Sequence, residues 1–360
     1  MIEYENLRKS NEPFYAEYQN IFSGILESGW FVLGNSVKNF EEEFARFVTM
    51  PHAIGVANGL DALILALRVL NFEAGSEILV PSNTYIATIL SILQCRLKPV
   101  LIEPDIQTYN INPQKIEEAI TKKTKAIMVV HLYGKACEMD TVTTLARKYH
   151  LEVIEDCAQS HGAMFKGKMT GSFGIGAFSF YPTKNLGCLG DGGAVTTSDE
   201  DFARNIRMYR NYGSEKKYYN ETIGVNSRLD EIQAGFLSVK LKHLQRITEH
   251  KRKLASLYQQ GLKEDFITPQ VHPDYFDVFH IYNVRHPKRD GLKEFLLKNE
   301  IKTEIHYPVP PHKQKAMEGI FGKQEFPIAD EIHATTLSLP ISFGTTESEV
   351  LKVIEVMNKF

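Results

Sequence analysis

Short apolar runs alternate with helix-like segments over residues 53–198. Seven runs rich in Val and Ile show little polar alternation, and they cover residues 53–57, 77–82, 99–104, 126–134, 152–159, 175–181 and 194–198. Strands buried on both faces have this composition, because neither face meets water. Residues 60–70 and 113–122 lie between such runs and predict helices, the second of which opens with a proline. The alternation predicts an α/β fold with a mostly parallel sheet.

The pattern changes after about residue 200. Residues 229–262 form a long charged stretch, which predicts a helix of unusual length that connects two bodies. A smaller α+β region follows, in which the proline-rich residues 306–311 predict an extended loop. We therefore expect a large α/β domain over residues 1–240 and a smaller C-terminal α+β domain over residues 241–360.

Composition and charge exclude several classes of protein. A chain of 360 residues that is 43% apolar can form a full hydrophobic core. The 41 basic and 44 acidic residues leave a net charge of −3, so we expect neither nucleic acid nor a membrane as a partner. No run reaches the ~20 apolar residues that cross a bilayer, and no secretory signal is visible, which predicts a cytoplasmic protein. Four cysteines without a C-x-x-C pair predict free thiols and no metal site.

The residues that follow the strands are where chemistry is expected, because ligands of such sheets bind beyond the carboxyl ends of the strands. The run EVIEDCAQSHG ends a strand with Asp156, which is either a site residue or the cap of a following helix. In FSFYPTKNLGCLGDGG, Lys184 follows Pro182 and enters a glycine-rich loop. Proline restricts the backbone conformation, and glycine allows the backbone to approach another group closely. Such a tightly defined backbone favours a functional lysine over a solvated surface lysine.

Two further strand ends carry candidate binding groups. In VANGLDAL, the chain passes through Asn58 and Gly59 directly into a helix, which leaves backbone N–H groups free for a phosphate, although an ordinary turn has the same form. In PSNTYIAT, Tyr85 lies just past a strand and is either a site residue or a core aromatic. A carboxylate, a lysine, an aromatic ring and a phosphate-sized nest together are the parts of a pyridoxal phosphate site.

The sequence resembles the DegT/StrS-type sugar aminotransferases, which are vitamin B6 enzymes of the aspartate-aminotransferase fold. The resemblance covers nearly the whole chain and rests on VANGLDAL, PSNTYIAT, IEDCAQSHGA, FSFYPTKNLGCLGDGGAV, GVNSRLDEIQAG and HYPVPPH, which occur in the order of the family. It implies fold type I of the pyridoxal phosphate enzymes, with a large cofactor-binding domain and a smaller C-terminal domain.

The resemblance also implies the residues that bind the cofactor. Lys184 would bond to the cofactor's aldehyde and later move a proton, and Asp156 would pair with the ring nitrogen. Gln159 would contact the ring or its oxygen, and Tyr85 would stack on the ring. The phosphate would be held by the backbone of Gly59 and Leu60, by Ser179, and by Asn226 of a second subunit. A homodimer with shared active sites follows. The family commonly has threonine at the position of Leu60, so a hydroxyl contact is missing there.

These residue types suit the chemistry. A carboxylate ~3 Å from a ring nitrogen attracts it by roughly 5 kcal/mol at an effective dielectric of ~20, before desolvation is subtracted. Asp156 would thereby keep the ring protonated and able to accept electrons. Lys184 must spend part of the cycle as a neutral amine, which a desolvated pocket favours by lowering its pKa.

We hypothesise a transamination in which L-glutamate gives its amino group to the cofactor and the keto carbon of a nucleotide-linked sugar receives it. The FYPTKNLG form, with GDGG after it, resembles members that aminate carbon 3 of a dTDP-3-keto-6-deoxyhexose. A 4-keto sugar as substrate and a non-catalytic regulatory relative remain alternatives. A sugar-dehydrating relative would carry histidine in place of Lys184.

The expected substrate contacts are Tyr181, Arg228, His306 and Tyr307. The segment 207–219 interleaves Arg207, Arg210, Lys216 and Lys217 with tyrosines, and it either supplies cations for a diphosphate or is a solvated helix end and loop. His161 is either a further contact or a structural histidine.

Overall fold

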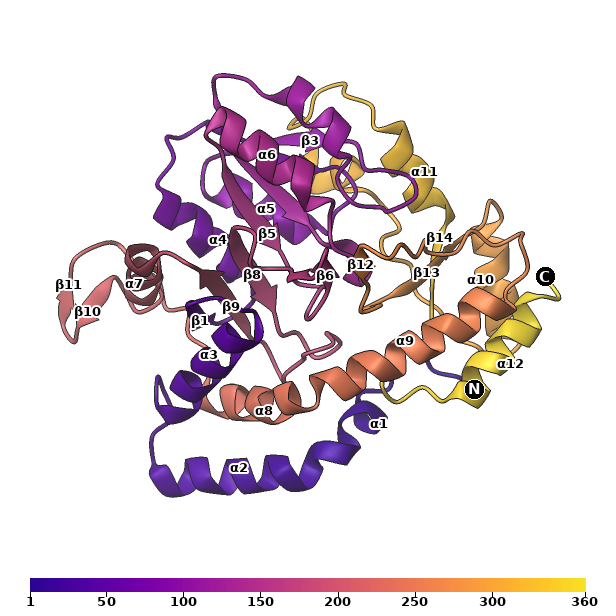
Figure 1. Ribbon diagram of the computed structural model, residues 1–360, viewed down its shortest axis with the longest axis horizontal. Coiled ribbons are helices and arrows are strands. Elements are labelled where there is room, and N and C mark those ends of the chain that lie inside the picture. The colour runs from indigo at the N-terminus through magenta and orange to yellow at the C-terminus, as the bar shows by residue number, and fades with distance from the viewer.

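A seven-stranded sheet forms the centre of the computed structural model, which describes residues 1–360 (Figure 1). The strand order is β1-β9-β8-β5-β4-β2-β3. The strands are β1 (His52–Val56), β2 (Glu77–Pro81), β3 (Lys98–Ile102), β4 (Thr124–Val130), β5 (Glu152–Asp156), β8 (Ile175–Ser179) and β9 (Gly193–Thr197). Neighbours are parallel except that β9 is antiparallel to β1 and β8. Each predicted run forms one strand, so the predicted α/β fold with a mostly parallel sheet is confirmed.

Helices cover both faces of the sheet, because successive strand residues point to opposite sides. Ile78, Val80 and Met128 share one core with α4, α5 and α7. Leu79 and Ile127 share the core on the other face with α6, where α3 and α8 extend the cover. These helices are α3 (Asn35–Phe47), α4 (Gly59–Leu70), α5 (Ile86–Gln94), α6 (Met139–Tyr149), α7 (Glu200–Tyr209) and α8 (Glu231–Lys242). Burial on both faces is the reason that the strand sequences lack polar alternation.

The helix predicted over residues 60–70 is confirmed as α4, but the helix predicted over residues 113–122 is wrong. That segment forms two 3-10 turns, η2 (Pro113–Lys115) and η3 (Glu117–Ala119). Thr121 and Thr124 then bond to each other, through Thr121 N–H to the Thr124 hydroxyl (2.9 Å) and Thr124 N–H to the Thr121 carbonyl (3.1 Å). This turn starts β4 and leaves too few residues for an α-helix.

The single long helix predicted over residues 229–262 is also wrong, because two helices occupy this range. These are α8 and α9 (Leu244–Gly261), which meet at His243, where φ is −104° and ψ is 1°. The side chain of His243 contacts Glu17 (Nε2 to Oε1, 3.0 Å) and the ring of Phe14. As Figure 1 shows, α9 runs from the sheet region to the C-terminal elements, so it does connect two parts of the molecule.

The C-terminal region has a core of its own around an antiparallel pair of strands. The strands β13 (Tyr282–Arg285) and β14 (Thr336–Leu339) pack with α9, α10 (Arg289–Lys298) and α12 (Glu347–Met357). The chain start also reaches this region, since Ile2 pairs with Ile301 and packs against the same core. The division of the chain between residues 240 and 241 stays a prediction.

The remaining elements are short or lie at the edges of the molecule. The helices are α1 (Leu7–Asn11), α2 (Tyr15–Ser28) and α11 (Pro327–Thr335), with 3-10 turns η1 (Glu12–Phe14), η4 (Leu132–Gly134), η5 (Pro311–Lys313) and η6 (Lys315–Met317). The small strands are β6 (Met164–Phe165), β7 (Lys168–Met169), β10 (Ser214–Lys216), β11 (Tyr219–Asn220) and β12 (Tyr275–Phe276).

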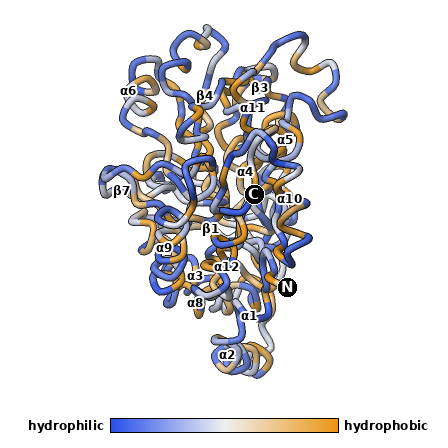
Figure 2. The backbone as a smooth tube through the Cα atoms, turned by 90° about the vertical axis from the view of Figure 1, so that its right-hand side faces the viewer, coloured by the Kyte–Doolittle hydropathy of each residue, from blue (hydrophilic) through white to orange (hydrophobic).

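The outer surface has two elements that stand apart from the body. Helix α2 lies at one end of the molecule in both views, and the β10–β11 hairpin projects beyond α7 in Figure 1. Figure 2 shows apolar segments concentrated along the central strands and hydrophilic ones along the outer loops. None of the helices has both the length and the hydropathy needed to cross a bilayer. The four cysteines are free, as predicted.

Candidate active site

Predicted site residues at or just after the ends of β1, β5 and β8 gather at one edge of the sheet. Asp156 and Ser179 are the last residues of the parallel strands β5 and β8. Gly193 begins the antiparallel strand β9 opposite Ser179, and Val56 ends β1 opposite the same glycine. The carboxyl ends of β1, β5 and β8 therefore open onto a common rim, where the topology of such sheets places ligands.

Asp156 is a buried carboxylate, 6% exposed, that the surrounding residues hold in place. The Thr88 hydroxyl donates to its Oδ2 (2.8 Å), and the N–H of Ala158 donates to its Oδ1 (3.1 Å). Burial raises the pKa of Asp156, and these hydrogen bonds and the charge of Lys184 oppose that rise. Because a turn and not a helix follows β5, the interpretation of Asp156 as a helix cap is wrong.

Lys184 lies in the turn that follows β8. Its backbone N–H donates to the Tyr181 carbonyl (2.8 Å), whereas its Nζ forms no hydrogen bond or ion pair within the chain. Burial lowers the pKa of the amine to about 8, although the nearby carboxylate of Asp156 acts in the opposite direction. At pH 8 about half of the amine is then neutral, against well under a hundredth for an ordinary lysine.

Gln159, Tyr85 and Tyr307 form one connected wall beside these groups. The Gln159 Nε2 donates to the Tyr307 hydroxyl (2.9 Å), and its Oε1 accepts from the N–H of Tyr133 (2.6 Å). The rings of Tyr85 and Tyr307 lie 5.0 Å apart between centroids with a tilt of 35°. Tyr85 is 52% exposed, so the interpretation as a core aromatic is wrong. The structure thus brings three predicted residues from distant segments together.

Two residues that hold the site groups in place were not among the predicted site residues. Tyr133 fixes Gln159 through its N–H, and its hydroxyl donates to the His306 carbonyl. It was placed in a strand predicted to run to residue 134, whereas β4 ends at Val130 and the turn η4 follows. The change from apolar residues to the letters HLYG at residues 131–134 is the sequence signal that the strand ends before Tyr133. Thr88, which donates a hydrogen bond to Asp156, is the last residue of the PSNTYIAT motif that contains Tyr85.

The N-terminus of α4 forms the predicted nest. The Asn58 side chain caps the helix by accepting from the N–H of Asp61 (2.9 Å), which leaves the N–H groups of Gly59 and Leu60 without partners. A Cβ on Gly59 would lie 2.5 Å from the Ser179 Cβ, so only glycine permits this approach. Two free N–H groups and a serine hydroxyl therefore converge, which suits an anion at a helix N-terminus.

The side chains of Asn226, Arg228 and Tyr181 form no hydrogen bond to this cluster within one chain. Asn226 is exposed and pairs through its backbone with Asn211. The Arg228 Nη1 donates to the Asn211 side chain (2.9 Å), and its guanidinium lies 5.5 Å from the ring centroid of Tyr212. Tyr181 is 53% exposed. The roles of these residues stay predictions.

The structure separates the cations of residues 207–219. Arg210 is buried, pairs with Glu41 and donates to the Gly55 carbonyl (2.6 Å), so it is not available to a diphosphate. Lys216 and Lys217 belong to the projecting hairpin and its turn, and both are exposed. The suggestion that this segment supplies diphosphate contacts is therefore wrong for Arg210.

His306 and His161 differ in their surroundings. The His306 Nδ1 shares a hydrogen bond with the Ser338 hydroxyl (2.9 Å), and burial lowers its pKa to about 4. His161 has no hydrogen-bond partner and lies between the rings of Phe178 and Phe180. Burial and the charge of Lys184 lower the pKa of His161 to about 3. This apolar packing favours the structural interpretation of His161.

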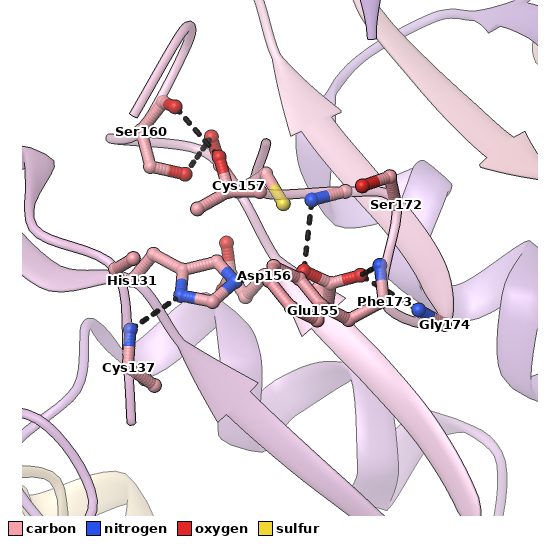
Figure 3. Close-up of polar contacts among 12 residues, drawn as sticks. His131, Cys137, Glu155, Asp156, Cys157, Ser160, Ser172, Phe173 and Gly174 are labelled. Atoms are coloured by element: carbon pink, nitrogen blue, oxygen red, sulfur yellow. Dashed lines mark hydrogen bonds and ion pairs between the residues drawn. The ribbon is translucent and has the colours of Figure 1, made fainter. Parts of the chain in front are cut away.

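A buried pair behind Asp156 holds the end of β5 (Figure 3). His131 Nε2 lies 2.9 Å from Glu155 Oε2, and His131 Nδ1 accepts from the N–H of Cys137 (2.9 Å). The two Glu155 oxygens also accept from the N–H groups of Gly171, Phe173 and Gly174. The donor atoms of His131, Glu155 and Cys157 lie within 4.8 Å of one another, a spacing that suits a metal. However, hydrogen bonds already use both ring nitrogens of His131 and both carboxylate oxygens of Glu155, so we interpret the pair as structural support for the end of β5.

These residues fit pyridoxal phosphate. The nest at α4 offers donors to a phosphate, the buried carboxylate of Asp156 suits a ring nitrogen, and the partner-free amine of Lys184 suits an aldehyde. Comparison with solved structures agrees with this fit. The X-ray crystal structure of S. venezuelae DesV in complex with a ketimine intermediate has a TM-score of 0.96 and 41% sequence identity, and the match covers 98% of this chain and 96% of that chain. The fold is therefore that of the pyridoxal-phosphate-dependent aminotransferases.

Within that class, the chain belongs to the DegT/DnrJ/EryC1/StrS aminotransferase family, whose model matches residues 15–358. A dTDP-3-amino-3,6-dideoxy-alpha-D-galactopyranose transaminase from Aneurinibacillus thermoaerophilus is 50% identical over 362 residues, which cover 100% of this chain and 99% of that one. A pleiotropic regulatory protein from Geobacillus stearothermophilus is 39% identical over 361 residues, which cover 99% and 97% of the two chains. The resemblance found in the sequence is thereby confirmed.

Proposed function

We propose that this protein transfers the amino group of L-glutamate to carbon 3 of a dTDP-3-keto-6-deoxyhexose, with pyridoxal phosphate as its cofactor. The observation that carries the proposal is a lysine whose amine has no hydrogen-bond partner in the chain, close to a buried aspartate at the carboxyl edge of the sheet. The choice of carbon 3 and of a dTDP sugar is supported by the FYPTKNLG motif and by the name of the relative that is 50% identical.

The residues of the site would divide the work between them. Bound pyridoxal phosphate supplies an electron sink for the carbon that loses its proton. Asp156 would hold a proton on the ring nitrogen, and its hydrogen bonds from Thr88 and Ala158 keep the carboxylate oriented. Lys184 would take up and release the substrate proton at its Nζ, for which a pKa near the working pH is best. Gln159 and Tyr85 would flank the ring.

A second copy of the chain would complete the site. Trp30, Phe31 and Leu26 are 64%, 54% and 54% exposed on α2 and the segment after it, an apolar surface of the kind that a partner covers. Asn226 is exposed, and its side chain forms no hydrogen bond to the nest of its own chain. We therefore propose a homodimer in which Asn226 contributes to the partner's phosphate site, with a cytoplasmic location. Sedimentation of the purified protein at twice the chain mass would support this assembly, and a monomer would contradict it.

The substrate assignment can be tested with a panel of sugars. The holoprotein is incubated with L-glutamate and with dTDP-3-keto or dTDP-4-keto sugars, and amino sugar and 2-oxoglutarate are measured by mass spectrometry. We expect 3-amino sugar with 2-oxoglutarate in equal amount. Amination of the 4-keto sugars alone would move the reaction to carbon 4. Absence of 2-oxoglutarate with every sugar would contradict the transaminase and favour a regulatory role.

A further inference from the structure

The turn that carries Lys184 rests on two buried lysines from the helices behind it. The Nζ of Lys251 on α9 donates to the Asn185 Oδ1 (2.8 Å) and to the His280 carbonyl (3.0 Å). The Nζ of Lys240 on α8 donates to the Gly187 carbonyl (3.0 Å). Both lysines are only 4% exposed, which is rare for this residue type because burial of a charge is costly. These lysines therefore need an explanation other than solubility.

Charge neutralisation does not explain them. Neither Lys240 nor Lys251 forms an ion pair within 4.0 Å, and Glu5, the acid whose charge acts on both lysines, accepts from the Ser10 hydroxyl (3.0 Å). Glu5 and both lysines line one cavity of about 20 Å³ behind the turn. Burial lowers the pKa of each lysine to about 8, against the opposing charge of Glu5. Instead, each ammonium donates a hydrogen bond to a residue that follows Lys184, namely Asn185 for Lys251 and Gly187 for Lys240.

These bonds continue to the other wall of the site. The Asn185 Nδ2 donates to the Val278 carbonyl (3.0 Å), and the N–H of Val278 donates to the Gly134 carbonyl (2.9 Å). Gly134 has φ of +97°, and a Cβ there would lie 2.6 Å from the N of His280, so the two segments are tightly joined. Tyr133, the neighbour of Gly134, orients Gln159. Lys251 thus ties the Lys184 turn to the segment that holds the ring-flanking residues.

We propose that Lys251 is a positioning residue, which fastens Asn185 to the His280 carbonyl and so fixes the turn from which Lys184 reaches the cofactor. The proposal rests on the proposed function in one respect, namely that Lys184 is the residue that bonds to pyridoxal phosphate. A reacting amine must be held to a fraction of an ångström, and such accuracy depends on the residues that support it. Lys251 comes from the predicted C-terminal domain, so this support bridges the two parts of the chain.

The charges around Lys184 make the role measurable. The ionisable groups that face Lys184 are Asp156, His161, Lys251, His280 and His306. Burial lowers the pKa of all three histidines, so they are neutral near pH 8. Lys251 and Lys184 repel each other when both are protonated, and Asp156 attracts the protonated Lys184. Removal of Lys251 would therefore move the titration of Lys184 upward in pH.

The test follows the capture of pyridoxal phosphate by the apoprotein, with no sugar or glutamate present. The bond to Lys184 is trapped with borohydride at set times from pH 6 to 10, and mass spectrometry of the peptides locates it. For Lys251→Met we expect capture at least about tenfold slower and a pH midpoint raised by about half a unit. Lys253→Met, an exposed position on the same helix that pairs with Glu347, is the matched control and should capture at the wild-type rate.

Asn185→Ala separates positioning from charge, because it removes the link to the turn and leaves the Lys251 ammonium in place. We expect slow capture with an unchanged pH midpoint, and the double variant should be no slower than Lys251→Met, since both changes break one connection. Wild-type capture in either single variant, or additive losses in the double variant, would overturn the proposal. If Lys251→Met does not fold, Asn185→Ala decides alone. If the wild-type protein captures pyridoxal phosphate on Lys184 but forms no amino sugar in the sugar panel, the proposed function is contradicted and this inference is left intact.

Discussion

The two sides of the candidate site are built differently. On the side of Asp156 and Lys184, every predicted group except Tyr85 is buried or half-buried, and contacts from other segments of the same chain position Asp156, Gln159 and the turn of Lys184. On the side of Tyr181, Asn226 and Arg228, the side chains are exposed or half-exposed, and none of these side chains forms a hydrogen bond to the first group. Within one chain the groups proposed for the cofactor ring are therefore already positioned, whereas Asn226, proposed for the partner's phosphate site, and the residues proposed for the sugar nucleotide are not.

The difference follows from what each side must do. Groups that change the electronic state of a cofactor have to be shielded from water, because electrostatic interactions weaken in a high dielectric. Groups that admit and release a large polar substrate must stay accessible, and a partner chain can supply the missing contacts without closing the route. Substitutions on the buried side should consequently affect the chemical step, and substitutions on the open side should affect substrate binding.

The largest effect is expected from Lys184→Ala. Without the amine, the protein has no group to bond to the aldehyde or to move the proton, so we expect kcat to fall by about 10⁴-fold or more. Borohydride treatment should no longer fix cofactor to the chain. Lys253→Ala is the control on the surface. Detection of fixed cofactor on another lysine in the wild type would remove Lys184 from the proposed mechanism.

Asp156→Asn should have the next largest effect. An amide cannot hold a positive charge on the ring nitrogen, so we expect kcat to fall about 10³-fold, or about 4 kcal/mol in the barrier. The substituted side chain can still accept the hydrogen bond from Ala158, and the melting temperature should change little. Thr88→Val, which removes a hydrogen bond that favours the charged carboxylate, should act in the same direction with a smaller loss. A variant Asp156→Asn with wild-type kcat would refute the division into two sides.

Gly59→Ala tests the nest at α4. The added Cβ would meet the Ser179 Cβ at 2.5 Å, so either the helix N-terminus or Ser179 must move away from the phosphate. We expect pyridoxal phosphate to bind about tenfold to a hundredfold more weakly, as measured by titration of the apoprotein. Leu60→Ala is the matched control at the next position, because Leu60 offers only its backbone N–H. Loss of affinity in Leu60→Ala equal to that in Gly59→Ala would contradict this geometry.

Arg228→Ala sharpens the comparison from the open side. If Arg228 meets the diphosphate, its removal should raise the KM for the sugar nucleotide about tenfold and leave kcat within a factor of about two. Asn211→Ala removes the side chain that orients Arg228 and should show a weaker form of the same change. An equal fall in kcat for Arg228→Ala would assign the residue to the chemical step instead.

The sequence predicted one side of this comparison far better than the other, for physical reasons. Strands buried on both faces carry an unmistakable composition, and the motifs at their ends place Asp156 and Lys184 correctly on the common rim. Lys251 lies in KLKHLQRITEHKRK, where lysines at helical spacing are typical of a solvated surface. Only its contact with Asn185, 66 positions away, shows that it is buried. The break at His243 was equally invisible, because the helical periodicity continues through it.

The smallest effect is expected from a change of pH on the rate at which Lys184 captures pyridoxal phosphate. This measurement tests the buried side of the site without any substitution. The neutral amine of Lys184 attacks the aldehyde and the protonated amine does not, so capture of pyridoxal phosphate should speed up as pH rises through about 8 and then level off. Because the folded-state pKa lies below the ordinary value of 10.5, the gain from pH 7 to pH 8 should be about fivefold, whereas an unperturbed lysine would gain about tenfold at each step up to pH 10. A capture rate that keeps rising tenfold per unit above pH 9 would mean that Lys184 is solvated like a surface lysine, and the contrast between a shielded and an open side would disappear.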